Sequence, residues 1–442
     1  MDAKIKKHLS SSQIIIFGFA GAIILGTILL MLPISSASGN MTTFSDALFT
    51  STSAVCVTGL VVHDTATHWS MFGQFIILLL IQVGGLGIVT LSVAMAMLAG
   101  RKISLMQRST LQDAISAPKV GGIVRLTGFI LKTTFLIELI GAILLSTVFC
   151  KEFGLKGVWL GIFHSVSAFC NAGFDLMGAK SPFSSLTSYS AQTLINAVIM
   201  LLIIIGGIGF LVWEEVKTNK HHIKKYRMQT KVVLSSTLFL IIAPAIYFYF
   251  AEFNGLPLNE RILNSMFQSV TPRTAGFNTA DLTQLTGTGQ IITIILMLIG
   301  GSPGSTAGGM KTTTAAVLIF SMISVFRKKD DVECFGRRIE DSTLKTASAI
   351  LLMYFILFLT GGLIISGVEK LPLMECLFET ASAIGTVGLT LGITPTLGTV
   401  SRIVLIGLMF FGRVGGLTLI FAALSKKQQN ISKKPQERIT VG

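Results

Sequence analysis

Long apolar runs separated by polar segments dominate this chain and predict its secondary structure. Eight of them approach or exceed about 20 residues, the length that an α-helix needs to cross the hydrocarbon core of a bilayer. Lipid offers no partner for open backbone groups, so each run predicts a helix rather than a strand or loop. The pattern predicts an all-α polytopic membrane protein. The runs are Ile14–Leu32, Phe75–Leu98, Gly128–Cys150, Ala191–Trp213, Val232–Ala251, Gln290–Phe320, Ala347–Val368 and Ile403–Leu424.

Composition supports this prediction and excludes other classes. Of the 442 residues, 51% are hydrophobic and 13% are charged, whereas soluble domains carry about 25% charged residues. An ordinary soluble enzyme and a disordered chain are therefore excluded. The five cysteines show no metal-binding spacing and are interpreted as free thiols. The first apolar run is longer than the core of a signal peptide, so we expect it to stay in the protein.

The net charge of +14 is explained by membrane orientation, and no nucleic-acid partner is predicted. Twenty-five Lys and Arg residues lie in the two chain ends and in the segments after the second, fourth and sixth runs. The four alternate segments hold only 7. Positive residues accumulate on the cytoplasmic side of membrane proteins. The distribution predicts a multi-pass protein with both termini in the cytoplasm.

The four outer segments contain one motif repeated. Each holds a stretch too apolar for a loop and too short for a span, ending in a glycine; these glycines are 114, 103 and 112 residues apart. A near-constant period indicates internal repeats. Each stretch predicts a half-helix that enters the membrane and returns on the same side, which requires shielding by protein or an aqueous path. The stretches are Phe44–Gly59, Gly157–Gly173, Asn259–Gly276 and Leu371–Gly388.

Four such re-entrant loops predict a pseudo-fourfold pore built from four membrane–pore-loop–membrane repeats, with eight transmembrane helices and four half-helices. The predicted boundaries are 1–110 for repeat 1, 111–220 for repeat 2, 221–335 for repeat 3, 336–425 for repeat 4 and 426–442 for a cytoplasmic tail.

The residues that end each stretch predict a cation filter made of backbone carbonyls. They include no carboxylate ring and no histidine cluster, so divalent and transition metals are disfavoured. Carbonyl dipoles and the negative ends of the half-helices favour a large monovalent cation, as in potassium filters. The predicted ion-binding residues are Val57, Thr58, Gly59, Asn171, Ala172, Gly173, Thr274, Ala275, Gly276, Thr386, Val387 and Gly388. Asp64, Asp175 and Asp281 follow the glycines and either concentrate cations at the mouth or are solvated loop carboxylates.

With these motifs, the chain resembles the superfamily of potassium transporters that contains KtrB, TrkH and HKT, over roughly residues 10–425. Eight spans without an extra N-terminal hairpin are most similar to KtrB. The resemblance implies potassium uptake across the plasma membrane, by a transporter or a channel-like pore, with sodium as a possible regulator or coupling ion. It also implies a homodimer with a cytosolic RCK-type, KtrA-like subunit that alone binds nucleotide. Each predicted filter segment has one glycine and the four segments differ in sequence, unlike the repeated TVGYG motif of tetrameric potassium channels.

The second run of each repeat carries a small-residue break, at Gly84-Gly85, Gly206-Gly207, Gly300-Gly301 and Gly412-Arg413. Only the third is expected to interrupt its helix fully, because glycine costs about 1 and proline about 3 kcal/mol in a helix. By resemblance this segment is an intramembrane gating loop. The predicted gate residues are Gly300, Gly301, Ser302, Pro303, Gly304, Ser305, Thr306, Ala307, Gly308, Gly309, Lys311 and Arg413.

Arg413 lies ten residues into the last run, where a charge costs at least about 2.5–3.5 kcal/mol and indicates function. The resemblance places it below the filter beside the gating loop, as an electrostatic barrier that hydrogen-bonds to carbonyls of the unwound segment.

Other functions are less well supported. Gly300–Gly304 fits G-x-S-x-G and Gly304–Thr312 nearly fits a P-loop, yet neither follows a predicted strand, so no enzyme is predicted. The alternative is an ion-coupled secondary transporter that works by alternating access. It predicts inverted halves with paired broken helices, whereas the repeats here are parallel, with one broken span expected.

Overall fold

The structure is a computed structural model that describes residues 10–99, 103–115, 121–416 and 418. The predicted tail 426–442, the basic N-terminal residues and the end of the last predicted span lie outside these ranges.

Each repeat begins with a long apolar helix. These four helices are long and apolar enough to cross a membrane. The first one begins at a capping box, in which Gln13 N donates to Ser10 Oγ over 3.2 Å and Ser10 N donates to Gln13 Oε1 over 3.0 Å. The helices are α1 (Ser11–Met31), α7 (Ile123–Phe153), α11 (Met228–Tyr247, continued by the π-turn Phe248–Glu252) and α15 (Asp341–Glu369).

A short helix follows in each repeat and packs against the helix before it. We call these four the pore helices. Apart from Val166 and Met266, the residues of their C-terminal halves are buried, as expected for helices that are too short to span the bilayer and pack inside the protein. They are α2 (Phe44–Val55), α8 (Lys156–Phe169), α12 (Leu258–Val270) and α16 (Leu373–Gly385).

The second span of each repeat is interrupted. In repeats 1 and 2 it bends by 95° and 93°, at Gly87 and Gly209. In repeat 3 a loop separates the two halves, and in repeat 4 the helix ends before Gly415. The helices are α4 (Met71–Leu86), α5 (Ile88–Leu98), α9 (Thr193–Ile208), α10 (Phe210–Asn219), α13 (Gly287–Leu298), α14 (Thr312–Phe326) and α17 (Thr399–Val414).

Two sequence expectations about these spans are wrong. First, more than one span is broken. Second, the helices of repeats 1, 2 and 4 do not end at the glycine pair or Gly-Arg pair that predicted the break; each ends three residues after the first residue of that pair, at Gly87, Gly209 and Gly415. The helix runs through Gly84 because this glycine faces the carbonyl group of Val55 at the end of α2, where a Cβ would collide. Gly206 faces Phe169, and Gly412 faces Ile384, in the same way. These glycines allow close helix packing.

The remaining elements lie in the connections between these helices. They are α3 (Thr65–His68), α6 (Leu105–Ile115), the hairpin of β1 (Glu333–Cys334) and β2 (Arg337–Arg338), and the 3₁₀ turns Pro33–Ser35, Met177–Ala179, Thr187–Tyr189, Ile223–Lys225, Leu282–Gln284 and Thr394–Thr396.

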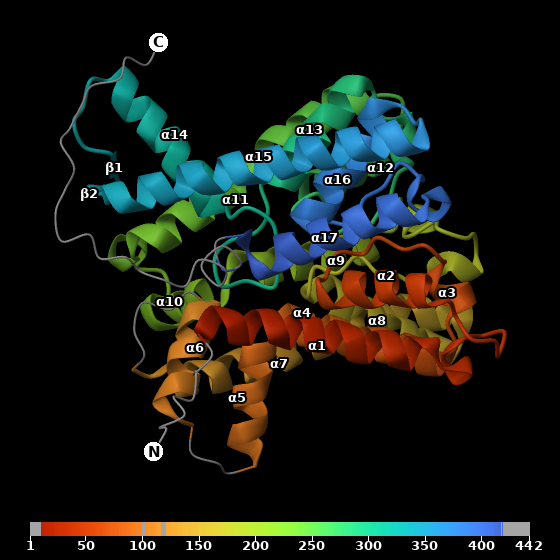
Figure 1. The fold of residues 1–442 in the computed structure, drawn as a ribbon. Coiled ribbons are helices and arrows are strands. Elements are labelled where there is room, and N and C mark those ends of the chain that lie inside the picture. The colour runs from red at the N-terminus through yellow and green to blue at the C-terminus, as the bar shows by residue number, and fades with distance from the viewer. Residues whose placement is uncertain (1–9, 100–102, 116–120, 417, 419–442) are drawn as a thin grey trace.

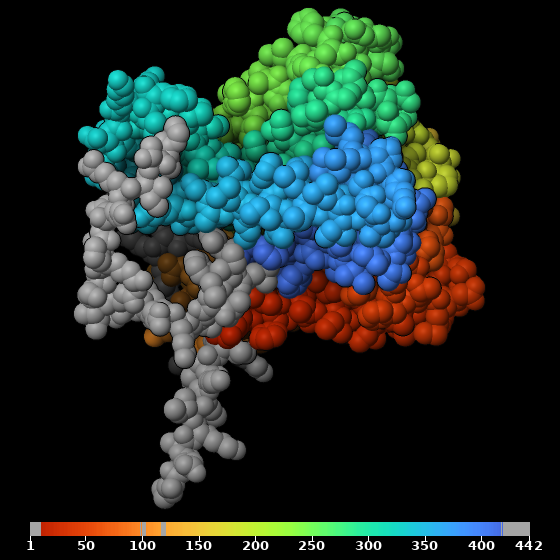
Figure 2. All heavy atoms as spheres, turned by 45° about the horizontal axis from the view of Figure 1, so that its top comes forward, coloured from red at the N-terminus to blue at the C-terminus, as the bar shows by residue number. Residues whose placement is uncertain are grey.

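The four repeats close into a ring. The second span of each repeat packs against the pore helix of the next: α4 against α8, α9 against α12, α13 against α16, and α17 back against α2. In Figure 1, α15 and α1 run in similar directions with α17 between them, while α5 leaves the bundle steeply. Figure 2 shows repeat 4 in blue directly against repeat 1 in red. The ring brings the four predicted filter segments to its centre.

Candidate functional site: an ion pathway

The four filter segments share one unusual backbone conformation. Two residues before each filter glycine, a residue other than glycine has a positive φ, which is uncommon and especially costly for β-branched side chains. The same conformation at four equivalent positions supports the predicted repeat and marks the segments as constrained. The φ values are 57° for Val57, 58° for Asn171, 69° for Thr274 and 52° for Thr386, followed by 91° for Gly59, 69° for Gly173, 78° for Gly276 and 94° for Gly388.

Hydroxyl groups near the end of each pore helix hold these segments. Gly59 N donates to Ser53 Oγ over 3.1 Å and Gly388 N donates to Ser382 Oγ over 3.0 Å. Ser167 Oγ donates to Phe174 O over 2.7 Å. In repeat 3 the donor to Phe277 O is Thr271, over 2.7 Å, which stands five residues before its glycine instead of six. Val270 occupies the sixth position before Gly276, so the sequence reveals Thr271 only when repeat 3 is shifted by one residue.

Each filter glycine lies against the neighbouring repeat. A Cβ built on Gly59 would be 2.5 Å from the carbonyl oxygen of Ala172, and one on Gly173 would be 2.8 Å from that of Ala275. Gly276 meets the carbonyl of Val387 in the same way, and Gly388 meets that of Thr58. The contacts run from repeat 1 to 2, 3, 4 and back to 1. The four filter segments therefore meet in one closed ring, and only glycine fits at its four contact points.

An outer cavity of about 390 Å³ opens directly above this ring and is lined by all four filter glycines. Asp64, Asp175 and Asp281 line it too. Asp64 is held by Phe183 N, 2.9 Å away, and by Thr67 Oγ1, 3.0 Å away. Burial raises the pKa of Asp175 to about 7, and the negative charge of Asp64 adds to the rise. The hydrogen bond from Thr283 lowers the pKa of Asp281.

The predicted gate residues of repeat 3 form a loop between α13 and α14. Gly300 N donates to Met310 O over 2.7 Å, which closes the neck of the loop. Lys311 Nζ donates to the carbonyl oxygens of Ala307, 2.8 Å away, and Gly308, 3.3 Å away. The Lys311 ammonium group thereby stabilises backbone carbonyls that no helix satisfies.

This loop is attached to repeat 2. Ser302 N donates to Gly207 O over 3.0 Å, and Phe210 N donates to Gly304 O over 2.7 Å. The bend at Gly209 leaves Gly207 O and Phe210 N without helical partners, and the loop satisfies both. A Cβ on Gly209 would be 2.6 Å from Pro303 O.

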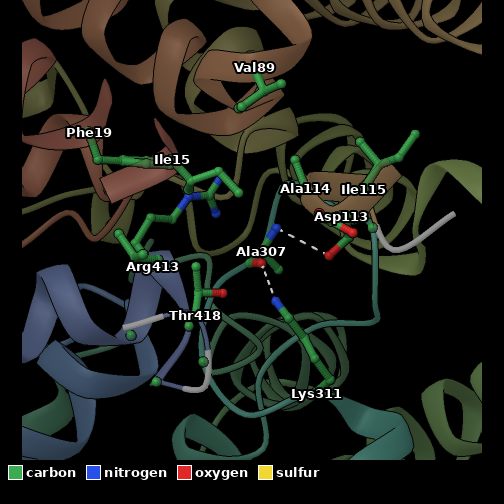
Figure 3. A pocket seen from close by; sticks show the side chains of 18 of the residues that line it. Ile15, Phe19, Val89, Asp113, Ala114, Ile115, Ala307, Lys311, Arg413 and Thr418 are labelled. Carbon is green, nitrogen blue, oxygen red and sulfur yellow. Dashed lines mark hydrogen bonds between the residues drawn. The ribbon is translucent and has the colours of Figure 1, made fainter. Parts of the chain in front are cut away.

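The same loop lies beneath the filter and above an inner cavity of about 330 Å³. A Cβ on Gly308 would collide with Thr386 Oγ1, and one on Gly309 would be 3.0 Å from Gly385 O. Figure 3 shows Ala307 between Arg413 on one side and Lys311, its hydrogen-bond donor, on another. The cavity is lined by Gly304, Ser305, Ala307, Gly309, Met310, Lys311 and Arg413, together with residues of α5, α6 and α17.

Arg413 bridges three repeats from α17. One guanidinium nitrogen donates to Thr306 O of the loop, and the other donates to Gly84 O and, over 3.2 Å, to Gly85 O. These carbonyls supply the polar partners that a charge at this depth requires. In contrast, Ser302, the serine of the G-x-S-x-G pattern, lies 3.1 Å from the Thr312 hydroxyl and forms no hydrogen bond to a histidine of the described ranges.

These features define a multi-pass membrane protein with four pore-loop repeats around a common centre. The chain belongs to the TrkH family of cation transport proteins, which matches residues 8–434. It is 42% identical to the potassium/sodium uptake protein NtpJ of Enterococcus hirae, over all of this chain and 99% of that protein. It is 38% identical to the Ktr system potassium uptake protein B of Bacillus subtilis, over 95% and 94% of the two chains.

The fold is also that of a solved structure, the potassium transporter TrkH from Vibrio parahaemolyticus. The TM-score is 0.69 at 19% sequence identity, over 95% of this chain and 86% of that one. The predicted pore-loop repeat architecture is therefore confirmed.

Proposed function

We propose that this chain takes up potassium across the plasma membrane through its central ring of four filter segments. The observation that carries the proposal is the cyclic contact of each filter glycine with a carbonyl of the next repeat, directly below the outer cavity. Uncharged oxygens in a ring suit a weakly hydrated monovalent cation. The names of the relatives, potassium/sodium uptake protein NtpJ and Ktr system potassium uptake protein B, support potassium as the ion, and the first of them supports a role for sodium.

The loop of residues 300–311 is the gate in this proposal, with Arg413 as an electrostatic barrier. The loop lies between the filter and the inner cavity, so an ion has to pass it. Its backbone does not form a continuous helix and is held by a few separate hydrogen bonds to α9, α10 and α17, so few bonds have to break for the loop to move. The guanidinium group places a positive charge on the same path.

Regulation in this proposal comes from a cytosolic RCK-type subunit that binds nucleotide and docks on the basic inner segments of a homodimer. The name "Ktr system" of the Bacillus subtilis relative supports an assembly of several components. The charge asymmetry supports cytoplasmic termini, and the exposed apolar faces of α1, α7, α11 and α15 contact lipid.

Alternating access explains these features less well, even though the second span of every repeat is interrupted. That mechanism relates two halves by inverted topology. Here all four filter segments share the same φ pattern and the same direction of contact around the ring, which favours one pore on one axis.

Rubidium uptake into proteoliposomes tests the proposal, with potassium, sodium and lithium as competitors and with Gly276→Asp as the variant. Potassium should inhibit uptake by the unaltered protein, and the variant should show none, because a side chain at Gly276 meets the carbonyl of Val387. Gly255→Asp is the matched control in the same outer segment, since a Cβ there has open space. Absence of cation flux in the unaltered protein, with and without a cytosolic partner, would overturn the proposal.

A further inference from the structure

Asn171 links the filter to the loop beneath it. It is fully buried in the filter segment of repeat 2. Its Nδ2 donates to Arg273 O over 3.2 Å and to Thr274 Oγ1 over 3.4 Å, both in the filter segment of repeat 3. Its Oδ1 accepts from Thr306 Oγ1 over 3.2 Å, in the loop of repeat 3. One side chain therefore contacts two filter segments and the loop.

The other three repeats have no amide at this position. Val57 is apolar, and Thr386 Oγ1 has no hydrogen-bond partner within the described part of the chain. All four residues adopt a positive φ, so the backbone conformation alone does not require asparagine. What distinguishes Asn171 is an amide that donates in one direction and accepts in the other.

Thr306 is held equally closely. Its single hydroxyl hydrogen is shared between Phe169 O, 3.0 Å away, and Asn171 Oδ1, 3.2 Å away, and its N donates to Gly206 O over 3.3 Å. A Cβ on Gly206 would be 2.9 Å from both Asn171 Oδ1 and Thr306 Oγ1, so a glycine at this position leaves the room that both side chains need. The carbonyl of Thr306 accepts from Arg413. A continuous chain of hydrogen bonds thus runs from α17 through the loop to two filter segments.

We propose that Asn171 is a positioning residue that makes the ion selectivity of the filter depend on the position of the loop. With Thr306 in place, the amide is oriented to hold the Arg273 carbonyl and the Thr274 hydroxyl against repeat 2. When the loop moves, Oδ1 loses its donor inside a buried site. A buried acceptor without a donor is unfavourable, so the amide reorients and releases the segment of repeat 3. This inference rests on the proposed potassium uptake.

Competition by sodium and potassium against rubidium uptake tests this coupling in Thr306→Val, Asn171→Leu and the double variant. Each single change should alter the ratio of the two inhibition constants by about three- to tenfold, the range for one lost hydrogen bond. The double variant should do no more than either alone, because both remove the same link. Thr306→Ser keeps the hydroxyl and should retain the selectivity of the unaltered protein.

Thr312→Val is the matched control. Thr312 is as deeply buried and its hydroxyl lies 3.1 Å from that of Ser302, without contact to a filter segment. We expect it to leave the selectivity ratio unchanged. Equal shifts in Thr306→Val and Thr312→Val, or additive effects in the double variant, would overturn the coupling while leaving the pore intact. Failure of potassium to inhibit uptake by the unaltered protein would instead overturn the proposed function and this inference with it.

Discussion

Arg402 at the start of α17 donates to Asp46 at the start of α2 over 2.6 Å, although 356 positions separate them in the chain. Both side chains are mostly buried, with 18% and 13% of their surface exposed. His63 contacts the other oxygen of Asp46 over 3.0 Å. The bond joins repeat 4 to repeat 1 on the outer side, where the ring of repeats closes.

Removing one partner of this pair should destabilise the closed ring. We expect Arg402→Gln to lower the free energy of unfolding by about 1–3 kcal/mol, below the cost for a fully buried pair, because Asp46 keeps its contact with His63. Thermal unfolding in detergent measures this. Arg338→Gln is the control, since the Arg338–Asp331 pair is exposed and should contribute less than about 1 kcal/mol. Equal losses in both variants would contradict the assignment.

Arg413→Ala should raise rubidium uptake if the guanidinium charge is a barrier. A barrier of about 1.4 kcal/mol corresponds to a tenfold change in rate, and we expect an increase of that order in equally expressed protein. Arg413→Lys keeps the charge but loses the fork that reaches Thr306 and Gly84 together. Uptake near the unaltered level in the lysine variant would assign the barrier to charge; an unchanged or lower rate in Arg413→Ala would count against any barrier.

Uptake at low ion concentration should increase as the external pH rises through about 7. Asp175 lines the outer cavity and its pKa is raised to about 7, so deprotonation adds a negative charge above the filter and attracts cations. Asp175→Asn should abolish this pH dependence. Stability should show the opposite trend between about pH 4 and 7, because the folded chain holds this proton more tightly than the unfolded chain, whose aspartate pKa is about 3.9.

Asp281→Asn offers the comparison for this prediction. The pKa of Asp281 is lowered, so this carboxylate stays charged throughout the range and its removal should reduce uptake without changing the pH midpoint. A midpoint near 7 that persists in Asp175→Asn would exclude Asp175 as the titrating group.

The bend between α4 and α5 should depend on Gly87. Its φ is 85° and its ψ is 135°, a conformation that side chains disfavour, so Gly87→Ala should cost about 1–3 kcal/mol. The nearest atom to a Cβ there is 3.8 Å away, which leaves the backbone as the cause. Gly21→Ala in α1 is the control, because a Cβ there meets nothing within 4 Å, and it should stabilise the helix slightly. Thermal unfolding distinguishes the two, and equal melting temperatures would contradict the prediction.

Much of the fold can be predicted from the sequence because it depends on local backbone preferences. The predicted loop from Gly300 to Lys311 matches the gap between α13, which ends at Leu298, and α14, which begins at Thr312, because glycine and proline act on their own backbone. The four filter glycines were found from their period, and all four adopt the positive φ that only glycine takes easily. The helical form of the long apolar runs follows from the need to satisfy backbone groups in lipid.

Tertiary structure alone decided how the repeats meet. The partners Asn171 and Thr306, and Asp46 and Arg402, are separated by 135 and 356 positions, and no local pattern encodes such pairs. The positions of the helix bends also depend on tertiary structure. The sequence predicts breaks at Gly84 and Gly206, but both glycines stay helical where they pack against carbonyl groups of the pore helices. The bends lie at Gly87 and Gly209 instead. Backbone preferences act within a few residues, while a close approach between helices exists only once the ring has closed.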